Sequence, residues 1–371
     1  MHGSASTAVL LLRTTVYAVL ATSVVGTHYT LPSPPLPASL VIQTSFLGDV
    51  ILTTPLLTEL SQRGPVDVVT TPAASALLAN HPAIRESIVY DKRGHDAGPL
   101  GFWRMAQRIR AGGYTAAYLA QGSWRSGALA SLGGIPDRVG FDTSSGRLLY
   151  THRIRHLSAQ HHAERLWRLA AGDGAAVPSA ETIRPRLYPG APERAAVDAL
   201  LRDVPRDGAK LLALAPGSIW GTKRWPHFPT LAARLAPLYR LVVIGGAADA
   251  SLAADIAKAV GPERVLNATG KLSLLESAAL IERCAVLVTN DSAPLHLASA
   301  MATPTVAIFG PTVPAFGFGP LAPLHVVAEL NNLDCRPCSS HGPQRCPLGH
   351  FNCMNNLDAQ RVLDAVMAVA Q

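Results

Sequence analysis

The fold is decided by residues 39–57, which read SLVIQTSFLGDVILTTPLL. The segment from Ser39 to Gln43 is a short apolar run that gives way to polar residues at Thr44, as is typical of a buried strand. Gly48 then provides a turn, after which apolar residues recur at helical spacing. Strand, turn and helix in this order begin a βαβ unit, so the pattern predicts a parallel sheet with helices on its faces.

The same alternation of strands and helices recurs along the chain in two blocks of similar size. The first block predicts strands at 66–70, 87–90 and 114–120, with helices at 73–80 and 102–110. Periodicity is weak over 172–208. The second block predicts strands at 211–215, 241–244, 286–288 and 305–309, with helices at 228–236, 249–259, 273–282 and 293–301. We therefore expect two doubly wound α/β domains, with ligands at the carboxyl ends of their strands.

These blocks divide the chain into four parts, with boundaries predicted at 1–37, 38–195, 208–356 and 357–371. The first part contains one Arg, no acid and an apolar patch at 16–25 that is too short to cross a bilayer comfortably. It is compatible with a targeting segment or with a loose tail left by a translation start assigned too early. The last part is expected to be an amphipathic helix from about Asp358 to Val369.

The charge of the chain favours an anionic partner. Hydrophobic residues make up 48% of the chain and charged residues 15%, which indicates a globular protein, and the net charge is +7. Residues 101–170 contain ten Arg against three acids, as expected of a surface that meets phosphorylated lipid or a membrane. The alternative is that the genome encodes most positive surface charges as Arg, which would give the same pattern without an anionic partner. No nucleic-acid-binding motif stands out, so we expect no nucleic acid partner.

A carboxylate follows the first predicted strand. Asp49 comes directly after Gly48, at the start of a helix and at the edge of the sheet where ligands bind. Asp at such a place is most often an N-cap, whose side chain accepts a hydrogen bond from a free amide of the helix. The alternative is a general base that takes a proton from an attacking hydroxyl. The spacing alone leaves both interpretations open.

A phosphate-binding turn is predicted after the first strand of the second block. Residues 215–226 read APGSIWGTKRWP. The amides of a Gly-Ser turn at Ser218 can cradle phosphate oxygens, and the ammonium of Lys223 supplies charge for a leaving diphosphate. The alternative is a surface loop with a solvated Lys-Arg pair and a packed Trp. The segment is not a Walker loop, because no Gly precedes Lys223 in the required arrangement.

A second polar turn follows the strand expected at 286–288. Residues 288–300 read VTNDSAPLHLASA. Ser292 and the next amides would face an anion at a helix N-terminus. Asp291 and His296 lie five residues apart and would hold a ribose hydroxyl or a phosphate between them. A His at this place is equally compatible with an ordinary helix residue.

Four of the five cysteines lie near the C-terminus. Cys335 and Cys338 form a C-x-x-C pair, and Cys346 and Cys353 follow. The set is compatible with a structural zinc site, with disulfides or with free thiols, whereas Cys284 is expected in the core. Two motifs are absent from the sequence. It has no Asp-x-Asp pair for a metal–diphosphate clamp and no G-x-G-x-x-G after a strand, which disfavours a nicotinamide-dependent enzyme.

Taken together, these stretches resemble glycosyltransferase family 9, the ADP-heptose:lipopolysaccharide heptosyltransferases. The resemblance rests on three motifs in the same order: the Gly48-Asp49-Val50 turn, the segment 216–226 and the Asn-Asp-Ser-x-Pro-x-His start at 290–296. It covers about residues 40–370, and the Cys-Pro-Leu-Gly-His sequence from Cys346 is similar to that of the type II enzymes. The resemblance implies a GT-B fold, with an acceptor-binding domain at 38–195 and a nucleotide-sugar-binding domain at 208–356.

The resemblance also implies a reaction, the inverting transfer of heptose from ADP-heptose to the inner-core heptose of a phosphorylated lipid A–core acceptor. Asp49 would be the catalytic base, and Lys223 would neutralise the diphosphate of the leaving ADP. The donor would be held by residues at matching positions, which are Ser218, Asp291, Ser292, Ala293 and His296. The family commonly has Gly in place of Ala293, where a Cβ would crowd a phosphate. Further candidates are Asp249 for the donor and, for the acceptor, Arg138 and Arg147.

By the same resemblance no cofactor is required, and zinc at the cysteines would be structural. The enzyme is expected in the cytoplasm, in peripheral contact with the inner face of the inner membrane. The alternatives are transfer of the first heptose (heptosyltransferase I), another GT-B nucleotide-sugar enzyme such as an epimerase, and a non-catalytic lipid-associating protein.

Overall fold

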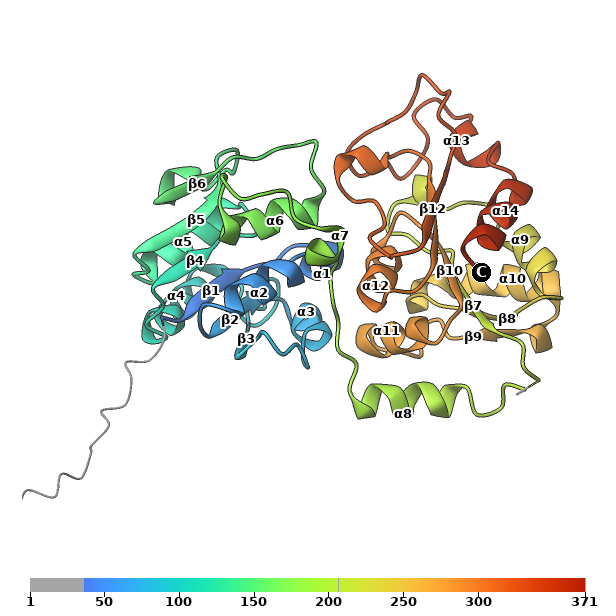
Figure 1. Ribbon diagram of the computed structural model, residues 1–371, viewed down its shortest axis with the longest axis horizontal. Helices are drawn as coiled ribbons and strands as arrows, with labels where there is room; N and C mark the ends of the chain where they lie inside the picture. The colour runs from blue at the N-terminus through green and yellow to red at the C-terminus, as the bar shows by residue number, and fades with distance from the viewer. Residues whose placement is uncertain (1–36, 206, 371) are drawn as a thin grey trace, which may run out of the picture. The chain divides into compact units, whose positions relative to one another are not determined.

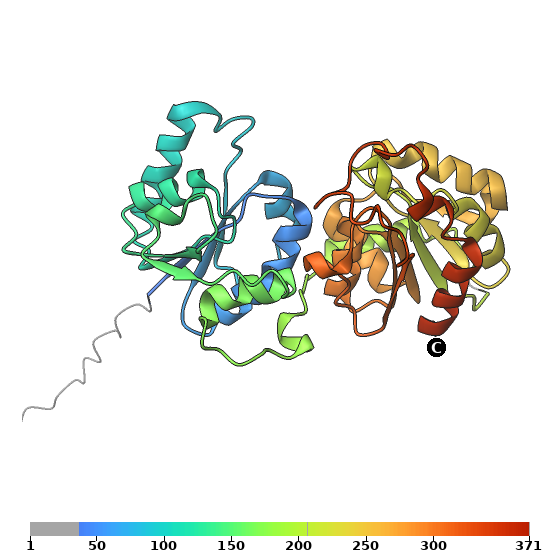
Figure 2. The ribbon, with the colours of Figure 1, turned by 90° about the horizontal axis from the view of Figure 1, so that it is seen from above.

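Two parallel sheets, one after the other along the chain, form the framework of the protein. The computed structural model describes residues 37–205 and 207–370 (Figure 1). The apolar patch at 16–25 and the rest of the predicted N-terminal extension up to residue 36 lie outside the described residues. Each sheet has six strands with helices packed on both faces (Figures 1 and 2). The prediction of two doubly wound α/β domains is confirmed.

The strands of the first sheet are β1 (Ser39–Ile42), β2 (Val66–Thr70), β3 (Glu86–Val89), β4 (Ala116–Tyr118), β5 (Asp137–Phe141) and β6 (His152–Ile154). They lie in the order β3-β2-β1-β4-β5-β6, and every neighbouring pair is parallel. Strand β1 has a partner on either side, because Ser39 is in register with both Val66 and Ala116. This central position explains the continuous apolar run of β1, which is covered on both faces.

The helices of the first half are α1 (Leu47–Leu52), α2 (Thr54–Ser61), α3 (Pro72–Leu77), α4 (Gly98–Ala111), α5 (Trp124–Leu132), α6 (His162–Ala171) and α7 (Ala180–Ile183), with the 3₁₀ turn η1 (Arg147–Leu149). Alternate residues of a strand point to opposite faces. Val41 therefore packs with α1, α2, α3 and α6, whereas Leu40 and Ile42 pack with α4 and α5. The helix expected after Gly48 is two short helices, α1 and α2, that meet at Thr53.

The strands of the second sheet are β7 (Leu211–Ala215), β8 (Arg240–Val243), β9 (Val265–Asn267), β10 (Val286–Asn290), β11 (Thr305–Phe309) and β12 (His325–Glu329). They lie in the order β12-β11-β10-β7-β8-β9 and are all parallel. Counted from its own first strand, each sheet has the order 3-2-1-4-5-6 of a Rossmann fold. The direction of winding therefore reverses between β1 and β4 and again between β7 and β10. Sheets of this kind bind ligands at such points.

The helices of the second half are α8 (Ala191–Leu200), α9 (Phe228–Leu235), α10 (Ala250–Val260), α11 (Leu274–Glu282), α12 (Ala293–Met301), α13 (Asn352–Asn355) and α14 (Ala359–Val369), with 3₁₀ turns η2 (Gly221–Lys223), η3 (Ala247–Asp249), η4 (Pro262–Arg264) and η5 (Pro314–Phe316). Helices α9, α10 and α14 pack on one face of the sheet, and α11 and α12 on the other. The predicted C-terminal helix is α14, and Asp358 caps it. Within 37–205 and 207–370, no helix combines the length and the apolar character needed to cross a membrane.

Helix α8 follows the first half in sequence but packs against α11 of the second. Two ion pairs join these helices, Arg194 with Glu282 and Asp198 with Arg283. The boundary predicted at residue 195 falls inside α8. A single apolar cluster also continues from α1 and α2 to α11 and α12. The assignment of one half to the acceptor and the other to the donor stays a prediction.

Candidate active site

Polar residues gather where the strands next to the two reversal points end. Asp49 follows β1, Ser218 and Lys223 follow β7, and Asp291 follows β10. Because the carboxyl ends of parallel strands share one edge of a sheet, residues that are distant in sequence meet there.

Asp49 lies in the first turn of α1, at its third residue. The N-cap is Phe46, so the interpretation of Asp49 as the N-cap is wrong. Its carboxylate accepts a hydrogen bond from the Ser45 hydroxyl, with Oγ 2.8 Å from Oδ2. Burial raises the pKa of Asp49 above its ordinary value, while the Ser45 hydrogen bond opposes that rise. The result is a partly buried carboxylate with an elevated pKa at the edge of the first sheet.

The Ser45 hydroxyl has one proton and two possible acceptors. Its oxygen lies 2.8 Å from Asp49 Oδ2 and 2.7 Å from the Gln43 side-chain oxygen. The Gln43 amide nitrogen donates to Thr53 Oγ1, which itself donates to the backbone carbonyl of Asp49, so this amide orientation follows from the network. When Asp49 is ionised, the Ser45 proton can point to it; when Asp49 is protonated, Asp49 can donate to Ser45 and Ser45 to Gln43. Ser45 thus responds to the protonation of Asp49.

A neutral histidine lies beside Asp49. His162, at the start of α6, places its Nε2 3.6 Å from Asp49 Oδ1. Burial lowers the pKa of His162 to about 3, and the nearby Arg165 acts in the same direction. Arg165 favours the ionised form of Asp49. Near neutral pH the imidazole therefore carries no charge that would pair with Asp49.

Gly48 connects the helix of Asp49 with His296 on α12. A Cβ built on Gly48 would lie 2.9 Å from the Cδ2 atom of His296, which is closer than real side chains approach. A glycine is therefore needed for α1 to approach α12. His296 is buried, burial lowers its pKa to about 4, and its Nδ1 has no hydrogen-bond partner among the described residues. Such an atom is available to a ligand.

Lys223 and Asp291 form a buried ion pair. Lys223 ends η2, and its Nζ lies 2.6 Å from Asp291 Oδ2. The Thr312 hydroxyl donates to the same oxygen over 2.7 Å. Both charges act on the pKa of His296: Asp291 raises it and Lys223 lowers it. Gly48, next to Asp49, therefore abuts His296, and His296 lies close enough to Asp291 and Lys223 for their charges to act on its pKa.

The neighbouring Asn290 supports this pair. Its side-chain nitrogen donates to the Pro216 carbonyl over 2.8 Å, and its oxygen accepts from the Trp225 amide over 3.2 Å. Asn290 thus ties the end of β10 to both sides of the loop that carries Lys223. Because Asn290 precedes Asp291, this bracing aligns the two charged residues.

The donor candidates Ser218 and Asp249 belong to adjacent turns. A Cβ on Gly217 would collide with the Asp249 carboxylate, so only Gly lets this turn approach Asp249. Asp249 also accepts a hydrogen bond from the Gly246 amide over 2.9 Å. The Ser218 hydroxyl accepts from the Trp220 amide over 3.2 Å. The structure therefore brings Asp249 to the predicted phosphate-binding turn.

Among the described residues the start of α12 offers the Ala293 amide, because Pro294 has no N–H and the Leu295 amide donates to the Ser292 carbonyl over 3.0 Å. Ser292 is the N-cap, but its side chain makes no capping bond to the helix within the described structure, and its hydroxyl donates weakly to the Asn290 carbonyl over 3.4 Å. Ser292 and Ala293 are half-buried. Free amides at a helix start attract an anion. This end of α12 can therefore receive a phosphate beside Asp291.

Comparison with known proteins identifies the family. A family model described as Glycosyltransferase family 9 (heptosyltransferase) matches residues 102–347. The chain belongs to this family. The resemblance read from the three motifs is thereby confirmed, and the protein is a glycosyltransferase.

Individual proteins and solved structures that are similar to this chain belong to the same family. Lipopolysaccharide heptosyltransferase 2 of Salmonella typhimurium is 30% identical over 293 residues, which cover 75% of this chain and 84% of that protein. Lipopolysaccharide heptosyltransferase 1 of Pseudomonas aeruginosa is 29% identical over 316 residues, covering 81% and 85%. A family 9 structure from Veillonella parvula matches with a TM-score of 0.78 at 24% identity, covering 91% of this chain and 97% of that one. E. coli ADP-heptose lps heptosyltransferase II matches with a TM-score of 0.72 at 24% identity, covering 90% and 98%. The predicted GT-B fold is confirmed.

The arginines predicted for the acceptor of this family 9 enzyme have structural contacts of their own. Arg138 donates from Nε to the Leu149 carbonyl over 2.6 Å and from Nη1 to the Ile135 carbonyl over 2.6 Å. These bonds hold β5 to η1 and occupy much of the guanidinium. Arg147 is more open, with one long bond of 3.4 Å to the Ser144 carbonyl.

Three further cations, which no sequence motif indicated, include one that contacts the end of the first central strand. Lys92 Nζ donates to the Thr44 carbonyl over 2.7 Å, next to Ser45. Burial lowers the pKa of Lys92, and the charges of Arg93 and Arg125 add to this effect, so the three cations lie close together. A signal was available in the sequence, because Lys92 and Arg93 come just after the strand predicted at 87–90, at the edge of the sheet where ligands bind.

The C-terminal cysteines of the family 9 enzyme are free thiols, and Cys284 lies in the core as expected. Residues 37–205 and 207–370 contain no group of three or more His, Cys, Asp or Glu side chains arranged to hold a metal ion. The disulfide alternative is not realised in this structure. Zinc at Cys335, Cys338, Cys346 and Cys353 stays a prediction.

The cysteine-containing segment braces the Lys223–Asp291 pair. The Thr222 amide donates to the Pro343 carbonyl over 3.3 Å, which supports the residue before Lys223. The Arg336 guanidinium donates to the Thr312 carbonyl over 2.9 Å and pairs with Glu329 over 2.7 Å. Arg336 therefore positions the threonine that binds Asp291, a role that no sequence motif indicated.

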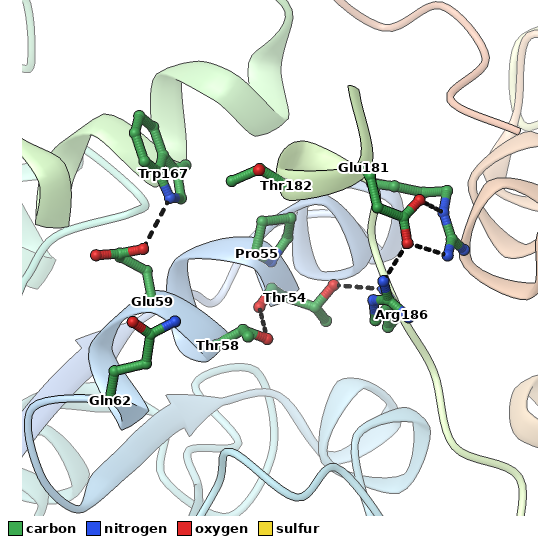
Figure 3. A pocket seen from close by; sticks show the side chains of 10 residues that line it. Thr54, Pro55, Thr58, Glu59, Gln62, Trp167, Glu181, Thr182 and Arg186 are labelled. Atoms are coloured by element: carbon green, nitrogen blue, oxygen red, sulfur yellow. Dashed lines mark hydrogen bonds and ion pairs between the residues drawn. The ribbon is translucent and has the colours of Figure 1, made fainter. Parts of the chain in front are cut away.

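A cavity of about 280 Å³ lies apart from these residues, on α2, α6 and α7 (Figure 3). Figure 3 shows the Trp167 indole N–H directed at Glu59, 3.2 Å away, and Glu181 paired with Arg186. No residue predicted for catalysis or binding lines this cavity. Its charged groups are paired among themselves, so the candidate active site is elsewhere.

Proposed function

We propose that this glycosyltransferase transfers a heptose from ADP-heptose to the inner-core heptose of lipopolysaccharide, with inversion, on the cytoplasmic face of the inner membrane. The similarity to proteins named lipopolysaccharide heptosyltransferase 2 supports the substrates. The mechanism is carried by one observation: Gly48 brings the helix of Asp49 against His296, and the charges of the Asp291–Lys223 pair act on that same histidine.

In this proposal Asp49 is the catalytic base. It removes the proton of the acceptor hydroxyl as that oxygen attacks the anomeric carbon from the face opposite ADP. A carboxylate with a raised pKa is better matched to proton transfer near neutral pH than an ordinary one. Ser45 and the neutral His162 would position Asp49 without adding a charge to it.

The second half would bind the donor. Lys223 would meet the diphosphate, and the pair with Asp291 would hold its ammonium in place before ADP-heptose arrives. The Ala293 amide at the start of α12 would add partial positive charge. As negative charge develops on ADP, these fixed groups would stabilise it without a metal ion. The other donor residues would be Ser218, Ser292, Ala293 and His296.

The acceptor would lie along the first sheet. Its phosphate groups would bind Lys92, which donates to the carbonyl of the residue before Ser45, and the neighbouring Arg93 and Arg125. Arg147 would be a more peripheral contact. Guanidinium groups bind phosphate through paired hydrogen bonds, which gives direction as well as charge.

An ADP-release assay with three acceptors tests the proposal. Acceptors with zero, one or two inner-core heptoses are incubated with ADP-heptose and the enzyme. We expect the acceptor with one heptose to react roughly tenfold faster than the others, because a site built for a sugar hydroxyl rejects acceptors that lack it. Preference for the acceptor without heptose would indicate heptosyltransferase I. Rapid turnover of the donor alone would favour an epimerase or hydrolase.

Replacing Ser45 with alanine should shift the acidic limb of the kcat–pH profile to higher pH. Asp49 must be ionised to act as the base, so activity falls as the pH drops through its pKa. The Ser45 hydrogen bond lowers that pKa, and its removal therefore raises it. The measurement is kcat against pH for wild type, S45A and S45T, which keeps the hydroxyl. If the acidic limb of S45A were unchanged, the Ser45 hydrogen bond would not control the pKa of the catalytic base.

A further inference from the structure

A set of large apolar side chains is exposed on one side of the first half. Leu100 and Trp103 on α4 are 68% and 51% exposed, Trp124 at the start of α5 is 64% exposed, and Leu148 in η1 is 81% exposed. We call this surface the α4–α5 face. Soluble surfaces seldom gather exposed Trp and Leu side chains without a partner.

These residues belong to one continuous surface. Helices α4 and α5 pack side by side (Figure 1), and the Arg125 guanidinium lies 5.7 Å from the centre of the Phe102 ring. Phe102 and Arg125 are the direct neighbours of Trp103 and Trp124. The start of α5 is tied to the segment before η1, because the Gly146 amide donates to the Gly122 carbonyl over 3.3 Å. The elements α4, α5 and η1, which carry these exposed side chains, are therefore neighbours.

The α4–α5 face is rich in arginine. Arg104, Arg125 and Arg147 form no ion pair with an acid in the described parts of the chain, and Arg108 pairs with Glu86. In the loop before α4, the carboxylates of Asp91 and Asp96 accept hydrogen bonds from backbone amides of the same loop. The unpaired charge of this face is therefore positive.

We propose that the α4–α5 face docks onto an anionic phospholipid surface. The inference rests on the proposed function, which requires a lipid-linked acceptor. Trp side chains favour the membrane interface, Leu side chains insert among the upper acyl groups, and Arg binds lipid phosphates. Nucleic acid would match the arginines but would gain little from Leu100 and Leu148. Arg125 also lies near Lys92, whose Nζ donates to the Thr44 carbonyl after β1, so a docked enzyme receives the acceptor at the edge of the sheet that carries Asp49.

The test is co-sedimentation of the full chain with vesicles. Vesicles of phosphatidylcholine alone are compared with vesicles that also contain phosphatidylglycerol. We expect binding to the anionic vesicles, weakened by salt, and roughly a tenfold loss in the double variant W103E/W124E. The matched control is L238E, which changes a 54% exposed leucine in the second half. Every variant is the full chain, so any contribution of other segments to vesicle binding is the same in each and cancels in the comparison.

Two further measurements keep the result interpretable. Thermal melting checks that the double variant is folded, and ADP release with a delipidated acceptor should stay at the wild-type rate. Equal vesicle binding by W103E/W124E and L238E, or equal binding to neutral and anionic vesicles, would overturn the proposal. Failure of the wild-type protein to co-sediment with either kind of vesicle would also overturn the proposal and would favour a protein partner. The vesicle assay needs no ADP-heptose, so it stays readable even if the proposed substrates are wrong.

Discussion

Replacing Asp49 with asparagine should lower kcat by about 10²–10⁴-fold while ADP-heptose still binds. Asparagine keeps the shape of the side chain and its hydrogen bond with Ser45 but cannot take a proton. The donor contacts lie on the second half and should be unaffected. Stopped-time ADP release gives kcat, and calorimetric titration with ADP-heptose gives Kd.

Glu59→Gln is the matched control for Asp49→Asn. Glu59 is also a partly buried carboxylate of the first half, but it faces the separate cavity beside Trp167 (Figure 3). We expect its kcat to equal that of wild type. If D49N instead retained its kcat, or lost donor binding and catalysis together, Asp49 would have a structural role and the proposed mechanism would be wrong.

Replacing Lys223 with methionine should lower kcat by about 10²–10³-fold. Methionine keeps the apolar stem but removes the ammonium that would stabilise the departing diphosphate. The change also leaves the buried Asp291 carboxylate with Thr312 as its remaining side-chain partner. Breaking a buried ion pair from one side costs roughly 3–5 kcal/mol of stability. Both kcat and the urea unfolding midpoint should therefore fall.

A second variant separates these two effects of Lys223. In K223M/D291N the unpaired charge is gone, so the unfolding midpoint should recover towards wild type. Its kcat should stay low, because the ammonium is still absent. The control is K258M, which removes an exposed lysine on α10. Recovery of both stability and kcat in the double variant would mean that Lys223 only neutralises Asp291.

The position of Asp49 illustrates how far sequence reasoning reaches. The sequence places a carboxylate after a strand and beside a glycine, and this is enough to predict a residue at the ligand-binding edge. It does not separate a cap from a base, because both occur in the first turn of a helix. The structure excludes the N-cap role, since α1 begins at Leu47 with Phe46 as its N-cap, whereas a cap at Asp49 would place the first helical residue at position 50.

Arg138 and Lys92 are residues whose roles could not be predicted from the sequence. Both are cations in an Arg-rich half, and composition gives no reason to prefer either. Arg138 is held by carbonyls of its own loop, whereas Lys92 reaches the end of β1. Which cation faces the site depends on side-chain direction and on neighbouring loops. These are properties of the packed chain and leave no periodic signal in the sequence.

The sequence by itself determined the two α/β halves, the strand ends that carry Asp49, Lys223 and Asp291, and the C-terminal helix. These features follow from local patterns. The periodicity of strands and helices and the glycines of turns can each be recognised within a few consecutive residues. Only the tertiary structure decided that Lys223 pairs with Asp291, that Gly48 abuts His296 and that Ser45 binds Asp49. The first two contacts join residues far apart in the chain, and their geometry is set by how the strands wind and the helices pack.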